Sequence, residues 1–239
     1  MLSSLSNSVG IMPAHAAAQP VLFCWSGGKD SAMALHALRR QSNVRITGLL
    51  TTVTETYDRI SMHGVRRSLL VRQAESLGLP LHEVKIPPQC VNPVYEARMR
   101  DALLQEKSND ACCVAFGDIF LQDLREYRER NLAQLKMTAI FPIWKRDTRE
   151  LASEFCTKGF RAIAVCVDPK KLSREFAGRE LDESFFRDLP VCVDPCGENG
   201  EFHTFVYDGP IFSTAIAVEH GEVVERDGFY FCDLKEKAT

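Results

Sequence analysis

Five short apolar runs alternate with helical patterns in the first part of the chain, and this alternation restricts the fold more than any other feature. The runs occupy residues 21–25, 44–53, 80–87, 111–118 and 138–144. Between them, apolar residues recur at spacings of three and four, as Ala32, Leu35 and Leu38 do, which marks one buried helical face. Strands that are apolar along their whole length need cover on both faces. The pattern therefore predicts a doubly wound α/β domain with a five-stranded parallel sheet over residues 20–144.

After Trp144 the pattern changes to a mixture of helical and strand-like segments. Asp147 and Glu150 form a capping box that opens a helix, and residues 161–168 form a further apolar run. The tail alternates apolar and polar residues around His220-Gly221, which is typical of a β-hairpin. We therefore expect a smaller α+β domain over residues 145–239 that binds the substrate.

The composition is that of an ordinary globular protein, with 45% hydrophobic and 26% charged residues. A net charge of -3 and a pI near 6.1 count against a nucleic-acid binder that works by bulk charge. No window approaches the ~20 apolar residues of a membrane span. Nine cysteines without a C-x-x-C pair count against a disulfide framework and indicate a reducing, cytoplasmic location.

The first nineteen residues carry no Lys, Arg, Asp or Glu. They lack the basic start and apolar core of a signal peptide, so we expect a disordered extension over residues 1–19. Met12 stays open as an alternative start.

The turn SGGKDS, residues 26–31, favours the binding of phosphate. It lies between the first strand and the first helix, where free N–H groups and the helix dipole attract anions. Gly27 and Gly28 permit close backbone approach, and Lys29 adds a positive charge. It is not a Walker A loop, because Asp30 follows the lysine where that motif needs Ser or Thr. Asp30 has two compatible roles open to it: it can cap the helix, and it can ligate Mg²⁺ that bridges a polyphosphate.

A second candidate site is GENGEFHT, residues 197–204, which carries two carboxylates and a histidine in a Gly-flanked loop. These groups can bind an ammonium ion, deprotonate it or orient a cationic substrate group, and the alternative is a solvated acidic turn. Gly117 and Asp118 follow the fourth strand at the edge where ligands of such sheets bind, although Asp118 can equally cap the next helix. Thr51 and Thr52 end the second strand, where we expect them to face adenosine.

Three arginines follow in the next helical pattern, Arg125, Arg128 and Arg130, interleaved with Glu126 and Glu129. Alternating charges of this kind are typical of a solvated helix face, which is the prediction for this segment.

SGGKDS resembles the SGG-x-DS loop of the PP-loop ATP pyrophosphatases, which cleave ATP between the α- and β-phosphates. Further segments extend the resemblance to the diphthine–ammonia ligase family over about residues 20–212: GDIFLQDLREYRE (117–129), FPIW (141–144), EFAGRELDESF (175–185) and DPCGENGEFHTFVYDGPIF (194–212). Eukaryotic members carry an E-G-G-E-type version of the last segment. Asn199 replaces one glycine here and leaves Glu198 and Glu201 in place.

The resemblance implies a fold of the HUP/PP-loop type and an enzyme that adenylates a carboxylate with ATP, releases pyrophosphate and uses ammonia to displace AMP. Its implied cofactors are ATP and Mg²⁺. Its implied acceptor is protein-linked diphthine or a small carboxylate, and a homodimer stays open. Lys29, the loop N–H groups and Mg²⁺ would stabilise the departing pyrophosphate.

Two alternatives remain: a PP-loop enzyme that thiolates tRNA, and an ATP-binding regulator without turnover. The acidic pI and the absence of C-x-x-C pairs count against the first, and the intact Lys29 and Asp30 count against the second.

The expected ATP-binding residues lie in the first loop and at the end of the second strand: Ser26, Gly27, Gly28, Lys29, Asp30, Ser31, Thr51 and Thr52. The expected catalytic or substrate-binding residues are Lys29, Gly117, Asp118, Glu198, Glu201, His203 and Thr204. Asp30 is the expected Mg²⁺ ligand.

Overall fold

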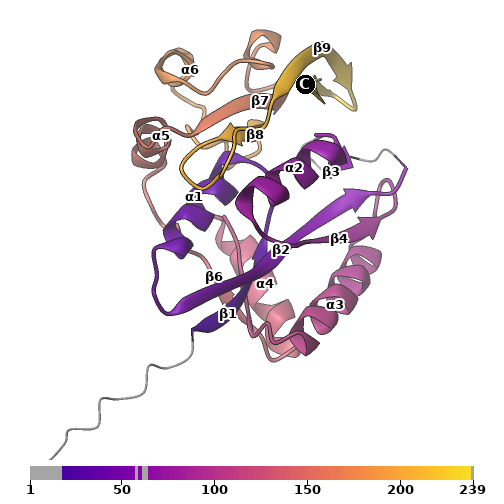
Figure 1. Cartoon of the computed structure of the whole chain (residues 1–239). Helices are drawn as coiled ribbons and strands as arrows, with labels where there is room; N and C mark the ends of the chain where they lie inside the picture. Colours follow the sequence, from indigo (N-terminus) through magenta and orange to yellow (C-terminus); the bar gives the residue numbers. More distant parts are fainter. Residues whose placement is uncertain (1–17, 57–58, 61–63, 238–239) are drawn as a thin grey trace, which may run out of the picture.

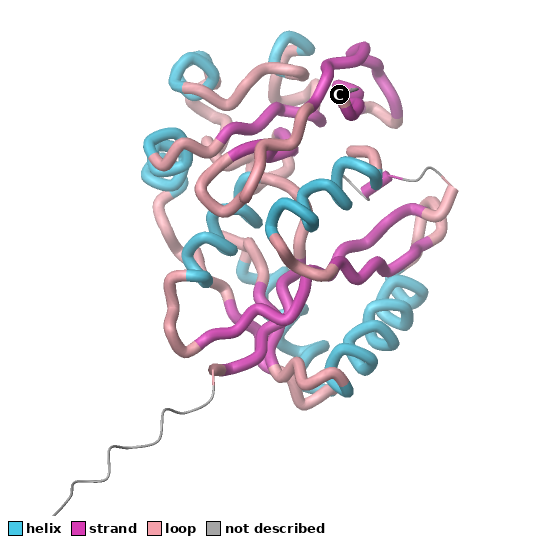
Figure 2. The backbone as a smooth tube through the Cα atoms, viewed as in Figure 1, coloured by secondary structure: helices cyan, strands magenta, loops and turns pink. Residues whose placement is uncertain are grey.

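The computed structural model describes residues 18–56, 59–60 and 64–237, so residues 1–17 of the predicted extension lie outside the described part of the chain. Within the described residues, six strands form one sheet, sheet A, and four form a second, sheet B. Figures 1 and 2 show the two sheets stacked, with helices between them and on the outer sides.

Sheet A contains five parallel strands in the order β4-β2-β1-β5-β6, so the predicted five-stranded parallel sheet is confirmed. A two-residue strand, β3, adds to the end of β2 in the antiparallel direction. The strands are β1 (Gln19–Cys24), β2 (Val44–Thr54), β3 (Arg59–Ile60), β4 (Leu81–Ile86), β5 (Cys113–Ala115) and β6 (Thr138–Ile140).

Helices cover both faces of sheet A, as the continuous apolar strands require. Successive residues of β1 point to opposite sides: Phe23 packs in a cluster with helices α1 (Lys29–Arg39) and α2 (Arg67–Leu77), and Leu22 in a cluster with α3 (Asn92–Ser108) and α4 (Gln122–Gln134). The domain is therefore doubly wound, as predicted.

Sheet B is antiparallel, with the order β8-β7-β10-β9. Its strands and neighbouring helices are α5 (Thr148–Thr157), β7 (Arg161–Val167), the 3-10 helix η1 (Arg174–Phe176), α6 (Glu183–Asp188), β8 (Phe202–Asp208), β9 (Val218–Arg226) and β10 (Phe229–Glu236). One hydrophobic cluster joins the two parts, because Leu35 of α1 belongs to it together with Ile163 of β7 and Phe205 of β8. The division into two domains near Trp144 therefore stays a prediction, and the hydrophobic core is continuous across this position.

The terminal hairpin turns at a different place from the predicted one. His220-Gly221 lie inside β9, and the chain reverses at Asp227-Gly228, whose φ values are 53° and 78°. Two successive positive φ values suit the type I′ turn that Asp-Gly favours in hairpins. Gly221 instead lies opposite a register shift near Asp233, where an added Cβ would meet the Asp233 carbonyl oxygen at 2.9 Å. A glycine inside a strand that marks such an irregularity gives the same sequence signal as a turn.

Every helix in the described ranges is too short or too polar to cross a membrane.

Candidate active site

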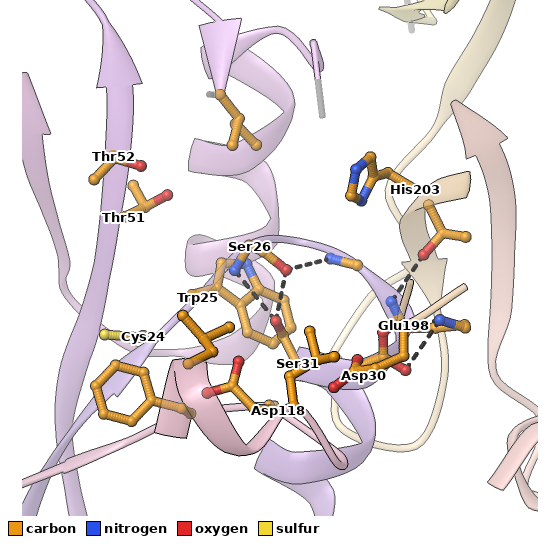
Figure 3. Close-up of a pocket in the computed structure, with 18 of the residues that line it drawn as sticks. Cys24, Trp25, Ser26, Asp30, Ser31, Thr51, Thr52, Asp118, Glu198 and His203 are labelled. Atoms are coloured by element: carbon orange, nitrogen blue, oxygen red, sulfur yellow. Dashed lines mark hydrogen bonds and ion pairs between the residues drawn. The ribbon is translucent and has the colours of Figure 1, made fainter. Parts of the chain in front are cut away.

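A cavity of about 410 Å³ opens at the carboxyl edge of sheet A, beside the start of β8 (Figure 3). Its lining comes from the 26–31 loop, the end of β2, helices α3 and α4, and the 197–204 segment. Most of the predicted site residues line it, and Gly27 and Glu201 do not. Those that do are Ser26, Gly28, Lys29, Asp30, Ser31, Thr51, Thr52, Gly117, Asp118, Glu198, His203 and Thr204.

The side chains of Ser26 and Ser31 form a hydrogen bond that joins the two ends of the 26–31 loop. Ser26 Oγ and Ser31 Oγ lie 2.6 Å apart, and Ser26 Oγ also accepts the N–H of Gly28 at 3.3 Å. Gly28 is the N-cap of α1, and the Asp30 carboxylate accepts Lys29 Nζ at 2.8 and 3.0 Å. The loop therefore presents the amino end of a helix to the cavity, as anion binding requires.

Lys29 joins this loop to the C-terminal part of the chain. Its side chain is buried, its backbone N–H donates to Thr204 Oγ1 at 2.9 Å, and its Nζ donates to the carbonyl oxygen of Cys196. Burial lowers the pKa of Lys29, but the Asp30 carboxylate more than offsets this effect, so the pKa is raised overall. The amine is therefore a fixed positive charge at neutral pH.

Gly117 brings strand β5 close to the start of helix α1. A Cβ at this position would lie 2.9 Å from the backbone nitrogen of Ser31 and 3.0 Å from the carbonyl carbon of Asp30. Only glycine permits this approach, so the predicted site residue Gly117 contributes its lack of a side chain.

Glu198 connects the 197–204 segment to the loop before α4. Its Oε1 accepts the backbone N–H groups of Ile119 at 2.8 Å and Phe120 at 3.3 Å. Burial, aided by the Asp30 charge, raises the pKa of Glu198 to about 7 against the opposing effect of those two hydrogen bonds. A carboxylate with this pKa exchanges protons at neutral pH, as a general base must.

Glu201 does not line the cavity. It is 1% exposed, its Oε1 accepts the N–H of Asp194 at 3.2 Å, and its Oε2 accepts the N–H of Asn199 at 3.0 Å. The Asn199 side chain also donates to Glu201 Oε1 at 3.2 Å. Glu201 therefore holds the 194–201 segment in shape through these hydrogen bonds, whereas Glu198 lines the cavity.

His203 lines the cavity on the side opposite Thr51 and Thr52 (Figure 3). Burial, together with the positive charge of Lys29, lowers the pKa of His203 to about 4. The imidazole is therefore neutral at pH 7.

Two residues at the α4 side of the cavity form a half-buried ion pair. Asp118 Oδ2 lies 2.6 Å from Arg128 Nε, and Arg128 also stacks on the Phe116 ring at 4.3 Å. Arg128 lines the cavity, so the predicted solvated face is wrong for this arginine, and Asp118 pairs with it. The missed signal was spacing, because Arg128 follows the cavity residue Leu124 by four positions and thus shares its helix face.

Metal binding depends on the carboxylates at the cavity. In the described ranges no group of three or more His, Cys, Asp and Glu side chains is arranged to hold a metal ion. Asp30 and Glu198 both line the cavity and interact electrostatically. One or two carboxylates completed by phosphate oxygens are the usual protein contribution to Mg²⁺ binding at nucleotide sites, so Asp30 fits that ion and Glu198 stays available for proton exchange.

Together, the parallel sheet with its helix-linked SGGKDS turn and the cavity at its carboxyl edge define an α/β protein of the PP-loop class. The chain belongs to the diphthamide synthase family. The family model of the diphthamide synthase N-terminal domain matches residues 19–137, and that of the C-terminal domain matches residues 147–238.

Curated relatives named diphthine–ammonia ligase are similar over most of this chain. The relative from Schizosaccharomyces pombe is 28% identical over 236 residues, which cover 91% of this chain and 39% of that protein. The chain thus spans well under half of its length. The relative from Danio rerio is 28% identical and that from Homo sapiens 26%, each over 83% of this chain and over 86% and 82% of the respective relative.

Among solved structures, the U34-tRNA thiolase NcsA from Methanococcus maripaludis has a TM-score of 0.37 and 18% identity, over 60% of this chain and 59% of that chain. A likeness at this level carries no argument about function.

Proposed function

We propose that this chain is an ATP-dependent ligase that activates a carboxylate as an acyl-adenylate and converts it to an amide with ammonia. The observation that carries the proposal is the joining of the 26–31 loop to the 194–204 segment through Lys29, which contacts Thr204 and Cys196. An anion-binding loop and a proton-accepting carboxylate then share one cavity. The names of the relatives support ammonia as the second substrate.

In the first step, an oxygen of the acceptor carboxylate attacks the α-phosphorus of ATP. The bond between that phosphorus and the bridging oxygen breaks, and pyrophosphate leaves with the bonding electrons. Lys29 and the N–H groups at the start of α1 bind and orient the polyphosphate and stabilise its growing charge. Mg²⁺ held by Asp30 and by phosphate oxygens would supply further charge stabilisation when bound.

In the second step, ammonia attacks the acyl carbon, the bond to the phosphate oxygen breaks, and AMP leaves. The attacking nitrogen must lose a proton, and ammonium must lose one before it can attack. Glu198 is the group in the cavity whose pKa, about 7, lets it accept such a proton at neutral pH. The neutral His203 contributes a hydrogen-bonding group without adding charge beside Lys29.

The direct test incubates the protein with ATP, Mg²⁺, ammonium and candidate acceptors, both protein-linked diphthine and small carboxylates. We expect release of pyrophosphate and AMP that depends on the acceptor, and an amide that depends on ammonium. Binding of ATP without any turnover would support a regulator instead, and sulfur transfer to tRNA would support a thiolase; either result overturns the proposal.

The Lys29→Ala variant tests the role of the loop. Removing the buried amine should lower the rate of pyrophosphate release by about 10²-fold, since fixed charges at a developing anion contribute on this scale. The exposed Lys170 provides the matched control, and Lys170→Ala should retain the wild-type rate. An unchanged rate in Lys29→Ala would remove this residue from the proposed chemistry.

A further inference from the structure

Gln73, on helix α2, is a fully buried polar side chain that the proposed chemistry does not use. Its Oε1 accepts the indole N–H of Trp25 at 2.9 Å. Its Nε2 donates to the carbonyl oxygens of Gly27 at 3.0 Å and Val206 at 2.6 Å. One amide group therefore joins Trp25, directly after β1, to the 26–31 loop and strand β8. Helix α2, which carries Gln73, lies between the two sheets (Figure 1).

These contacts fix the orientation of one peptide bond in the loop. The carbonyl oxygen of Gly27 accepts both Gln73 Nε2 and the backbone N–H of Val206, the latter at 2.9 Å. In a planar trans peptide the C=O and N–H groups point in opposite directions. The N–H of Gly28 is therefore directed to the other side, toward Ser26 Oγ and the cavity that Gly28 lines.

The loop needs such a restraint because of its glycines. Gly27 has a φ of 81°, and neither Gly27 nor Gly28 has a side chain to limit rotation of the peptide between them. Without a partner for the Gly27 carbonyl, this peptide can rotate and turn the oxygen, instead of the N–H, toward an anion. A Cβ on Gly27 would lie 2.7 Å from Gln73 Oε1, so the amide fits closely against the loop.

We infer that Gln73 is a positioning residue of the nucleotide site: together with the N–H of Val206, it holds the Gly27–Gly28 peptide with the Gly28 N–H directed at a phosphate group of ATP. Gln73 acts through the loop and does not line the cavity itself. The inference rests on the proposed function, since it takes ATP as the ligand.

The test compares Gln73→Met with Ser76→Ala. Met keeps the approximate volume of the side chain and removes both polar groups. Ser76 lies on the same helix and also binds the C-terminal part, since its Oγ accepts the N–H of Thr214 at 3.0 Å and donates to its carbonyl oxygen at 2.5 Å, but it has no contact with the loop. Both variants are made in a Trp144→Phe background, so that Trp25 is the sole remaining tryptophan.

Three measurements separate positioning from a general loss of stability: the midpoint of thermal unfolding, the Trp25 emission maximum, and the dissociation constant for ATP. Both variants should unfold at a lower temperature. Gln73→Met alone should shift the Trp25 emission, and it should weaken ATP binding by roughly tenfold, the scale of one hydrogen bond. In turnover, the KM for ATP should rise while the KM for ammonium stays constant.

If the Gln73→Met variant does not fold, Gln73→Glu provides the test of the positioning role. A neutral carboxylic acid can donate one hydrogen bond to the Gly27 carbonyl, whereas the ionised form cannot. The ATP affinity of Gln73→Glu, relative to the wild type at the same pH, should therefore recover as the pH falls.

Wild-type ATP affinity in folded Gln73 variants, or equal weakening in Ser76→Ala, would overturn the inference alone. A wild-type protein that binds no ATP would overturn the proposed function and this inference with it.

Discussion

At the scale of single residues, the two glutamates of the GENGE pattern have different surroundings although they lie three positions apart. Both carboxylate oxygens of Glu201 accept backbone N–H groups, those of Asp194 and Asn199, and the side chain does not line the cavity. Glu198 faces the cavity beside Asp30, where burial disfavours its charge. The proton-accepting role therefore belongs to Glu198 in our proposal.

Glu198→Gln should change how activity depends on pH. Because burial raises the pKa of Glu198 to about 7, the basic form accumulates as the pH rises through 7. The wild-type kcat/KM for ammonium should therefore rise across this range, and the Glu198→Gln variant should be slower, by about 10²-fold, and lack this inflection. Stopped assays of amide formation from about pH 5.5 to about pH 8.5, a range that brackets this pKa, measure the effect. The same inflection in the variant would assign the titration to another group.

Stability provides an independent check on the same group. A carboxyl group whose pKa is raised on folding binds more protons in the folded state between the two pKa values, about 4.5 and about 7, so folding stability falls as the pH rises through this range. Glu198→Gln should therefore lose less stability than the wild type between about pH 5 and about pH 8, as seen in thermal unfolding midpoints.

Sequence reasoning located the loop residues because SGGKDS and GENGEFHT are contiguous in the chain. It missed Arg128, although the spacing of Arg128 from Leu124 places both on one helix face. It also missed Gln73, which binds Val206, 133 positions later. The burial of Gln73 cannot be recognised until the packing of the second sheet against α2 is known.

At the scale of elements, helix α5 illustrates a local signal that specifies a local structure. The sequence predicts that Asp147 opens this helix, and its Oδ1 accepts the N–H groups of Arg149 and Glu150, each at 2.9 Å. The predicted hairpin turn is misplaced because Gly221 and Gly228 give the same sequence signal, and only the pairing of β9 with β10 distinguishes a strand irregularity from a turn.

The cap of α5 gives a prediction of stability. Asp147→Ala removes the acceptor for two N–H groups and should lower the free energy of unfolding by about 1 kcal/mol. Asp147→Asn retains an acceptor of similar capping strength and should stay close to the wild type. Urea denaturation of the three proteins measures the difference. Equal losses in both variants would show that the charge matters more than the cap.

At the scale of the whole molecule, the two sheets are held together by polar ties as well as by their shared core. Asp233 of β10 accepts Arg59 Nη1 at 3.0 Å and Arg66 Nη2 at 2.7 Å, which joins the terminal hairpin to β3 and the start of α2. Burial raises the pKa of Asp233, but the hydrogen bonds from the two arginines outweigh this effect and lower it overall. This tie lies next to Ile60, a residue of the cavity lining.

Asp233→Ala should therefore lower the free energy of unfolding by about 1 kcal/mol, the upper range for partly exposed ion pairs. Because the pKa of Asp233 is lowered on folding, the contribution is present at neutral pH and is lost as the pH falls through the folded-state pKa. The control is Glu236→Ala, on the same strand as Asp233. It removes a more exposed ion pair, that of Glu236 with Arg72 of α2, and should have little effect on stability. Similar losses in both variants at neutral pH, or an Asp233 effect that persists in acid, would contradict this assignment.

The parallel sheet and its helices could be predicted from periodicity, because each element carries its own pattern. The relation of the two sheets could not, since it depends on side-chain shapes from distant segments. Phe23, Ile163 and Phe205 lie in one cluster, although the chain changes its pattern between them.

The hydrogen bonds that join Thr204 and Val206 to the 26–31 loop also affect the order in which parts of the chain fold during translation. Domains begin to fold as they emerge during synthesis, N-terminal part first. All strands of sheet A have been synthesised once Ile140 is added, but Lys29 and Gly27 still lack the partners that β8 supplies. A nascent chain paused before residue 204 would thus carry all strands of sheet A but a 26–31 loop without these bonds. Lys29 and Gly27 therefore gain these partners only after strand β8 has been synthesised.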